Sequence, residues 1–267
     1  MCYSYLDMAY SSDCGTIREK NEDAGCIAAS LGFCAVADGM GGSSAGEIAS
    51  AKILSELKQQ LEKTAVLSLN ERRSAIGKAI KNSDHDLTKY AQTKGYKNGC
   101  GSTVAGILFD NESPSRALGF HIGDSRIYRL RGKKITLLSQ DHTIAAETGI
   151  KERDLPQIYH GMLTKAIGFG FTYRPTMVEL SMQEKDLYLL CTDGLNKVFT
   201  DMALEAILNA YSHNNAETIT KILMKNALSG ISPDNITILI VKILNFTEKI
   251  SPISKTKTLM NKKNSSF

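Results

Sequence analysis

Four aspartates stand where apolar segments of the chain end or begin, and carboxylates in such places could bind metal ions. Asp38 follows "FCAVA" and Asp193 follows "LYLLCT", and a glycine comes directly after each of them. Asp124 lies in "GDSR", between two expected strands, and Asp234 lies in "SPDN", directly before "ITILIVKI". An aspartate beside a glycine is also ordinary turn chemistry. A metal site therefore depends on whether the fold brings the four side chains together.

If the four carboxylates converge, their charges must be compensated. Two carboxylates about 4 Å apart repel each other by about 4 kcal/mol at an effective dielectric constant of about 20. Such a cluster needs bound cations or raised pKa values. Because the ligand atoms are oxygens and no cysteine–histidine cluster accompanies them, the sequence favours hard divalent ions, Mg²⁺ or Mn²⁺, over zinc.

The six cysteines indicate no thiol chemistry. None belongs to a C-x-x-C pair, and none has an arginine six residues downstream, so the Cys-x5-Arg loop of thiol phosphatases is absent. A phosphate-binding P-loop requires a second glycine five residues before the glycine of a Gly-Lys pair. Neither Gly-Lys pair of the chain has one, so a P-loop is excluded. Scattered cysteines in a chain of 267 residues are typical of a reduced, intracellular protein. Without a signal peptide or a membrane span we expect a cytoplasmic protein, and export by another route stays open.

The net charge of +4 is concentrated at the C-terminal end. Residues 247–267 hold five lysines and one glutamate, which leaves 27 basic and 27 acidic groups in residues 1–246. We therefore expect a neutral domain over 1–246 and a basic, disordered tail over 247–267. Contact of this tail with a membrane surface or a nucleic acid is the less favoured alternative. The neutral domain does not interleave basic and aromatic residues, so we expect no nucleic-acid partner.

Apolar runs bounded by Gly, Asp, Asn or Pro predict a series of short strands. They cover residues 33–37, 102–109, 116–123, 126–131, 134–138, 186–191 and 235–243. Short turns join several of these runs, which favours antiparallel pairing.

Helical periodicity separates the strands. Ser44 and Glu47 have the spacing of a capping box, and apolar residues follow them at helical intervals. Further helices are expected over 71–92, 201–211 and 216–228. Long amphipathic helices inserted into a meandering antiparallel sheet predict an α+β fold, with sheets packed face to face and helices outside them.

Eight segments form a further, ordered pattern. They are "TIREKNEDA" (16–24), "VADGMGGSSAGEIAS" (36–50), "GSTVAGILF" (101–109), "HIGDSRIYRL" (121–130), "LLSQDHT" (137–143), "LTKAIG" (163–168), "LYLLCTDGL" (187–195) and "SPDNITILIV" (232–241). Together they resemble the motifs of the metal-dependent serine/threonine phosphatases, the type 2C or PPM family, in its bacterial form. The resemblance implies a four-layer α-β-β-α sandwich of two antiparallel sheets flanked by helices, in agreement with the expected layers.

The resemblance also implies a centre of two metal ions, Mn²⁺ or Mg²⁺, with a third and weaker ion beside them. Asp38 would bridge the two ions and the carbonyl of Gly39 would bind one of them. A glycine there allows the main chain to approach the metals closely. Asp193 and Asp234 match ligands of the second ion, and Asp124 together with Asp193 matches ligands of the third.

The residues around the ions follow from the same resemblance. Glu22 and Asp23 match acidic residues that hold metal-bound waters, and Asn235 is expected to orient its loop rather than to bind metal. Arg18 matches a phosphate-binding arginine, whose fork would hold two phosphate oxygens. Arg18 and Asp38 are thus the expected catalytic residues. A water that bridges the two metals would attack phosphorus directly, without a covalent phosphoenzyme.

The sequence leaves the general acid of the reaction unassigned and includes two histidine-related positions of interest. Met40 stands where eukaryotic relatives have a histidine that is proposed to protonate the leaving group, so no residue is assigned as general acid. His142 belongs to the "DHT" block, and we expect a structural role for it rather than a catalytic one. Ser43 stands where bacterial relatives often have a histidine.

Substrate specificity is the least determined feature of the sequence. Residues 144–175 correspond to the flap that overhangs the site in bacterial relatives, and Lys151, Arg153 and Lys165 there could meet a phosphorylated, acidic partner. The resemblance implies a monomeric phosphoserine/phosphothreonine protein phosphatase that acts on the products of a serine/threonine kinase. Two alternatives stay open: a catalytically inert phosphoprotein-binding module of the same fold, and a phosphatase for a small phosphate ester.

Overall fold

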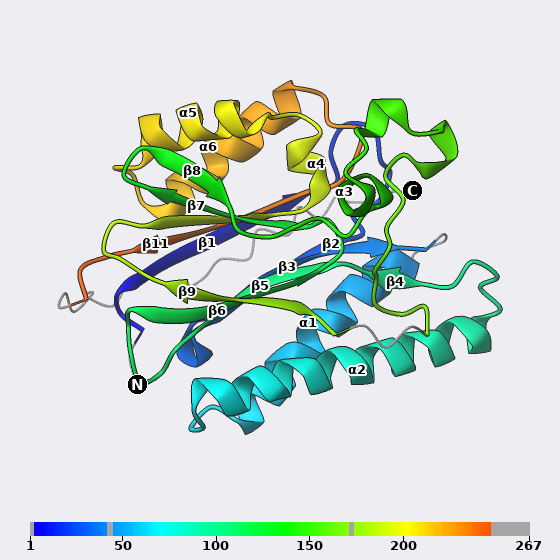
Figure 1. Ribbon diagram of the computed structural model, residues 1–267, viewed down its shortest axis with the longest axis horizontal. Coiled ribbons are helices and arrows are strands. Elements are labelled where there is room, and N and C mark those ends of the chain that lie inside the picture. Colours follow the sequence, from blue (N-terminus) through cyan, green and yellow to red (C-terminus); the bar gives the residue numbers. More distant parts are fainter. Residues whose placement is uncertain (1–2, 42–44, 171–173, 247–267) are drawn as a thin grey trace, which may run out of the picture.

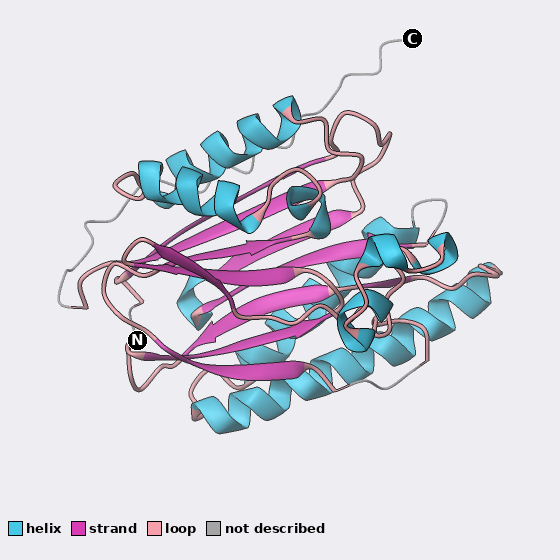
Figure 2. Cartoon of the chain, turned by 45° about the horizontal axis from the view of Figure 1, so that its top comes forward, coloured by secondary structure: helices cyan, strands magenta, loops and turns pink. Residues whose placement is uncertain are grey.

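The computed structural model describes residues 3–41, 45–170 and 174–246, which form four layers (Figure 1). Two antiparallel sheets lie face to face in the middle, and each carries a pair of long helices on its outer side, as Figures 1 and 2 show. The predicted α+β sandwich of two antiparallel sheets flanked by helices is therefore confirmed.

The first sheet has the strand order β1-β11-β10-β7-β8, and every neighbouring pair is antiparallel. Its strands are β1 (Leu6–Asp13), β7 (Arg126–Arg131), β8 (Lys134–Leu137), β10 (Leu187–Cys191) and β11 (Ile236–Ile243). Two helices cover its outer face, α5 (Asp201–Tyr211) and α6 (Ala216–Ser229). The short helix α4 (Asp193–Asn196) connects β10 to α5.

The second sheet has the strand order β2-β3-β5-β6-β9, with the short strand β4 beside β3. Its strands are β2 (Asp23–Ala28), β3 (Phe33–Met40), β4 (Gly101–Ser102), β5 (Val104–Phe109), β6 (Arg116–Ile122) and β9 (Thr176–Ser181). Its outer face packs on α1 (Ala45–Lys63) and α2 (Leu69–Lys94). The connections include the short helices η1 (Ala29–Leu31), α3 (Ile144–Thr148), η2 (Glu152–Asp154) and η3 (Gln157–Tyr159).

The central strands are mostly apolar because both of their faces are buried. In β11, Ile238 and Ile240 pack toward α5 and α6, whereas Leu239 and Val241 pack between the two sheets. Successive side chains of a strand point to opposite faces, so a strand with a core on either side needs an apolar residue at every position. The same requirement explains why the sequence showed continuous apolar runs instead of polar–apolar alternation.

Most predicted elements are confirmed with small shifts of their ends. Helix α2 is slightly longer than the predicted 71–92, because Ser68 caps it and forms a capping box with Glu71. The predicted strand 102–109 is interrupted at Thr103, so it forms β4 and β5. The predicted cap at Ser44, the departure at Ser43 and the predicted tail all lie outside the described residues.

Three strands, β1, β2 and β9, are absent from the prediction. All three are sheet edges with mostly half-buried or exposed residues, and β2 is also rich in small residues. Their sequences therefore lack the apolar density by which the central strands were recognised. Within 3–41, 45–170 and 174–246, no helix is long and apolar enough to cross a membrane.

The fold predicts a large difference between two chemically identical substitutions. Ile107 of β5 is fully buried between the sheets, so Ile107→Ala should lower the free energy of unfolding by about 3 kcal/mol through lost burial and a residual cavity. Ile158 of η3 is 73% exposed, and Ile158→Ala is the matched control with an expected change within about 0.5 kcal/mol. Urea unfolding measures both values, and equal losses would contradict the assignment of the inter-sheet core.

Candidate metal centre

Acidic residues from both sheets meet at one end of the sandwich. Asp23 is the first residue of β2 and stands directly opposite Asp38 of β3 in the strand register. Asp193 is the first residue of α4, just after β10, and Asp234 stands just before β11, the strand that pairs with β10. The β6–β7 turn, which passes from one sheet to the other, carries Asp124. The structure thus brings together the four aspartates singled out by the sequence, and it adds Asp23 as a direct neighbour.

The pKa values show how strongly these carboxylates interact. Burial raises the pKa of Asp38 well above its usual value, and the charges of Asp23, Asp193, Asp124 and Asp234 raise it further. Burial is also the main cause that raises the pKa of Asp23 and of Asp124 to about 7 each. Without added positive charge, the deeper part of this cluster therefore holds protons close to neutral pH.

Two basic side chains stand at the rim of the cluster. The Arg18 guanidinium lies 3.0 Å from Asp234 Oδ1 and 3.1 Å from Oδ2, and its Nε donates to the carbonyl of Pro233. The Lys197 ammonium lies 2.5 Å from Asp193 Oδ2 and 2.9 Å from Asp234 Oδ2. Burial alone would raise the pKa of Asp234, but these two cations hold it below its usual value. Arg18, which the sequence singled out, thus lies beside Asp234, and Lys197 is a further contact that the sequence did not single out.

Lys197 was not singled out from the sequence, although its distance from Asp193 along the chain could have indicated a contact between the two side chains. It follows Asp193 by four residues, the interval at which side chains on a helix meet. The interval becomes informative only once α4 is known to be a helix, and a four-residue helix has too little periodicity to be predicted.

Glycines allow the main chain to close around the acidic residues. A Cβ atom on Gly39 would lie 2.0 Å from the carbonyl oxygen of Gly46 in α1, and the Gly39 N–H donates to the carbonyl of Glu22. A Cβ atom on Gly46 would lie 2.7 Å from the carboxyl carbon of Glu22. Side chains at these positions would separate α1, the end of β3 and the Glu22 segment, so the glycines are required for the close approach of the three.

Hydroxyl groups fix the main chain at Asp38. The Asp38 N–H donates to Oγ1 of Thr103, and the Thr103 N–H donates to the carbonyl of Asp38. The same Thr103 hydroxyl is hydrogen-bonded to the Ser125 hydroxyl, next to Asp124. The interruption between β4 and β5 therefore links the end of β3 to the turn that carries Asp124.

A half-buried ion pair also anchors that turn. The Arg126 guanidinium, two residues after Asp124, forms a bidentate pair with Asp141 at 2.9 and 2.7 Å. It also donates to the hydroxyl of Tyr128. The arginine of "GDSR" and the aspartate of "QDHT" are therefore structural partners, a relation that the separate motifs did not reveal.

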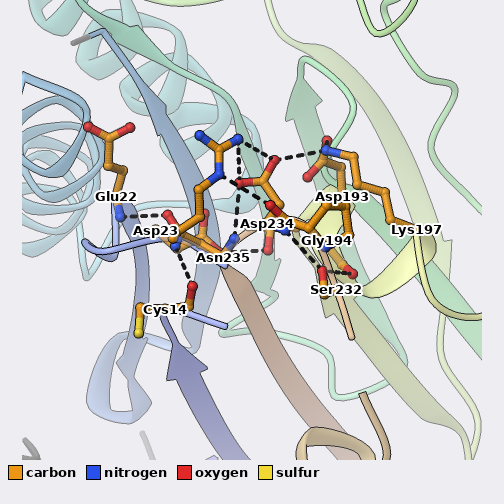
Figure 3. A network of polar contacts seen from close by, with 12 residues as sticks. Cys14, Glu22, Asp23, Asp193, Gly194, Lys197, Ser232, Asp234 and Asn235 are labelled. Atoms are coloured by element: carbon orange, nitrogen blue, oxygen red, sulfur yellow. Dashed lines mark hydrogen bonds and ion pairs between the residues drawn. The ribbon is translucent and has the colours of Figure 1, made fainter. Parts of the chain in front are cut away.

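Asn235 joins three segments of the site. Its Oδ1 accepts from the Glu22 N–H at 2.8 Å, and its Nδ2 donates to the carbonyls of Cys14 at 3.0 Å and Lys20 at 2.8 Å (Figure 3). The loop between these two carbonyls contains Arg18. The side chain is fully hydrogen-bonded and buried, which supports the predicted loop-orienting role of Asn235.

His142 stacks on His121 and contacts Gly123, the residue before Asp124. The rings of His121 and His142 are 4.7 Å apart and inclined by 12°. Nδ1 of His142 accepts from the N–H of Gly123, and Nε2 is hydrogen-bonded to Thr176. Burial and the neighbouring His121 lower the pKa of His142 to about 4, so it is a neutral acceptor at neutral pH. These contacts support the structural role expected from the sequence.

The flap carries exposed apolar side chains and paired charges. Ile158 and Met162 are exposed, and the predicted cations Arg153 and Lys165 lie 3.8 Å from Asp154 and 3.9 Å from Glu147. The positive charge expected for this segment is thus partly neutralised by its own carboxylates. Residues 171–173, near the end of the predicted flap, lie outside the described residues.

The chemistry of the cluster fits a divalent cation. Asp23 Oδ1 and Asp193 Oδ1 are buried and have no hydrogen-bond partner in the described part of the chain. Unpaired buried carboxylate oxygens are destabilising unless a cation or proton compensates them. No group of three His, Cys, Asp or Glu side chains among the described residues already stands in a ligating arrangement, and Lys197 and Arg18 occupy part of the carboxylate surface.

Comparisons with known proteins agree with this architecture. Residues 19–231 match the family Protein phosphatase 2C. The serine/threonine phosphatase stp of Listeria monocytogenes is 30% identical over 244 residues, 87% of this chain and 94% of that protein. The serine/threonine protein phosphatase PstP of Mycobacterium tuberculosis is 30% identical over 90% of this chain, and the chain spans 46% of that relative's length.

A solved structure shows the same fold. The catalytic domain of the serine/threonine protein phosphatase PstP, in complex with two manganese ions, has a TM-score of 0.75 and 30% identity over 90% of this chain and 99% of that chain. The fold match defines the class, a two-sheet phosphatase domain. The family match is more specific, and the chain belongs to the protein phosphatase 2C family.

The role of Asn235 leads to a stability prediction. Asn235→Ala leaves the Glu22 N–H and the carbonyls of Cys14 and Lys20 without their partner, so the free energy of unfolding should fall by about 2 kcal/mol. The matched control is Asn209→Ala, because Asn209 also donates to two carbonyls but is half-exposed and far from the acidic cluster. Urea unfolding that gives equal losses for the two variants would refute the special role of Asn235.

The neutral state of His142 predicts a pH dependence. Its pKa is lowered from 6.5 to about 4, so between these values the unfolded chain binds a proton that the folded protein does not. The stability that this histidine contributes is present above about pH 6.5 and is lost as the pH falls toward about 4. The difference in unfolding free energy between wild type and His142→Asn should therefore shrink by about 2 kcal/mol over that range.

The groups that face His142 are His121, Lys165, Glu147 and Asp141. All of them remain in both proteins, so their own titration largely cancels in the difference. A constant difference between wild type and His142→Asn from neutral to acidic pH would contradict a buried neutral histidine.

Proposed function

We propose that this chain is a metal-dependent phosphatase that hydrolyses phosphoserine and phosphothreonine in proteins. The observation that carries the proposal is the convergence, in a member of the protein phosphatase 2C family, of carboxylates from both sheets, among them buried oxygens without a hydrogen-bond partner in the described part of the chain. The relatives with serine/threonine phosphatase names support the reaction class.

In this proposal the acidic residues hold two Mn²⁺ or Mg²⁺ ions. Asp38 and the carbonyl of Gly39 lie at the end of β3, and Asp193 and Asp234 face them from the first sheet. With Asp193, Asp124 would hold a third and weaker ion. Bound ions would lower the pKa of a water molecule and neutralise phosphate oxygens.

The surrounding residues would orient the ions and the substrate. Glu22 and Asp23 would hold waters of the metal shell, and Asn235 would keep the Arg18 loop in place. Arg18 is half-exposed at the rim, where its fork can exchange Asp234 for two oxygens of a phosphate group. The negative charge that develops on phosphate would then be held by a planar donor pair.

The thiols support hydrolysis without a covalent cysteine intermediate. Cys191 directly precedes the site at the end of β10, and burial raises the pKa of its thiol to about 12. A thiol of this kind is not a nucleophile at neutral pH. The free cysteines of the described residues also favour a reducing, cytoplasmic location, which is part of the proposal.

The substrates in this proposal are phosphorylated proteins produced by a serine/threonine kinase, and the enzyme acts as a monomer. The flap is the segment with which such partners would interact, because its apolar side chains Ile158 and Met162 are exposed next to paired charges. The inert-module alternative is not favoured, because the family's metal-site aspartates are all present in the chain.

Hydrolysis of a phosphothreonine peptide tests the proposal. Wild type should release phosphate with Mn²⁺ and lose this activity in EDTA, and Asp193→Asn should lower kcat/KM at least about 100-fold, because a proposed metal ligand is weakened. Asp86→Asn, an exposed aspartate on α2, is the matched control and should retain activity. Parallel rates on a small phosphate ester separate a protein phosphatase from a metabolite phosphatase. A wild type that binds Mn²⁺ but hydrolyses neither substrate would overturn the enzyme proposal.

A further inference from the structure

Lys197 occupies an unusual position for a surface lysine. Its single ammonium group bridges Asp193 and Asp234, at 2.5 and 2.9 Å, and Figure 3 shows it pointing toward both carboxylates. These are the two side chains that the proposed function assigns to one metal ion. A cation that belongs to the protein itself therefore already contacts both of them.

Contacts around α4 hold the two carboxylates at this distance from Lys197. A Cβ atom on Gly194 would lie 2.0 Å from the carbonyl oxygen of Asn235, so the first turn of α4 lies directly against the turn before β11. The Ser232 hydroxyl donates to the carbonyl of Gly194 and accepts from the Asp234 N–H. These bonds lock the two carboxylates side by side, and the four-residue spacing from Asp193 brings Lys197 between them.

An ordinary lysine pair in the same chain provides a comparison. Lys221 in α6 lies 2.6 Å from Glu217, also four residues away. Within the described residues it pairs with this one carboxylate, and both side chains are about two-thirds exposed. The carboxylates that Lys197 bridges are only 22% exposed, so water and salt screen this interaction less. Lys197 is thus a partly desolvated bridge, whereas Lys221 is an exposed helix pair.

We propose that Lys197 is an internal cation that competes with the metal: it holds Asp193 and Asp234 in the metal-free protein and has to leave both before they bind a divalent ion. The proposal rests on the metal site of the proposed function. Metal–oxygen bonds to Mg²⁺ are about 2.0–2.1 Å long, so an ion bound to the two contacted oxygens would lie very close to the ammonium. Two cations so close repel each other strongly, and the flexible lysine stem is the part that can move.

Competition of this kind sets the apparent metal affinity. An intrinsic dissociation constant is raised by the inverse of the fraction of protein in which the binding site is free. If the lysine bridge is formed in about nine-tenths of metal-free molecules, the apparent Kd of the ion is about tenfold higher than without the lysine. In exchange, the bridge stabilises the acidic cluster while no metal is bound.

Isothermal titration calorimetry with Mn²⁺ on the full chain tests the proposal. Lys197→Met keeps the length of the stem and removes the charge, so it should bind Mn²⁺ about tenfold more tightly than wild type. Lys197→Arg keeps a cation and should retain a Kd close to that of wild type. Lys221→Met is the matched control, and its Kd should not change.

Thermal unfolding gives a second readout that does not depend on catalysis. In EDTA, Lys197→Met should unfold at a lower temperature than wild type because the carboxylates lose their internal cation, and saturating Mn²⁺ should abolish the difference. Lys197→Gln serves the same purpose if the methionine variant does not fold. A Kd for Lys197→Met or Lys197→Gln equal to or higher than that of wild type would overturn the inference and leave the metal site intact. If neither wild type nor the variants bind Mn²⁺, the metal site of the proposed function fails, and the inference fails with it.

Discussion

Repulsion among carboxylates at the shared end of the two sheets is the constraint on which the rest of this structure depends. Asp23 and Asp38 come from adjacent strands of one sheet, and Asp193 and Asp234 lie just after β10 and just before β11, which are adjacent strands of the other. Burial raises the pKa of Asp38 well above its usual value, and the other aspartates raise it further. A chain that gathers these groups needs positive charge there, and this need links the fold to metal-dependent chemistry.

The protein compensates part of this charge by itself, and it does so unevenly. Arg18 and Lys197 both contact Asp234 at the rim, where the carboxylate keeps a pKa below its usual value. Deeper in the cluster, Asp23 Oδ1 has no partner among the described residues, and its carboxyl group has a pKa of about 7. In the described part of the chain, cationic side chains therefore compensate the rim carboxylates, whereas no side chain compensates Asp23 Oδ1 deeper in the cluster.

The scaffold around the cluster consists mainly of main-chain contacts. Gly39 lets α1 approach the end of β3, Thr103 binds both backbone groups of Asp38, and Asn235 ties the Arg18 loop to the turn before β11. Such bonds fix positions without adding charge to an already acidic site. Glycine, threonine and asparagine therefore supply the main-chain contacts of the site.

The sequence by itself determined the central strands, the long helices and the candidate ligands. Runs such as that of β11 are apolar at most positions because a core lies on both faces, and this pattern is local. The tertiary structure alone decided three other features. The edge strands β1 and β9 form because a neighbouring strand pairs with them, and Asp23 faces Asp38 because of the register of β2 and β3. The bridge from Lys197 to Asp234 joins the end of α4 to the turn before β11, and no local sequence pattern encodes a distance between side chains of separate elements.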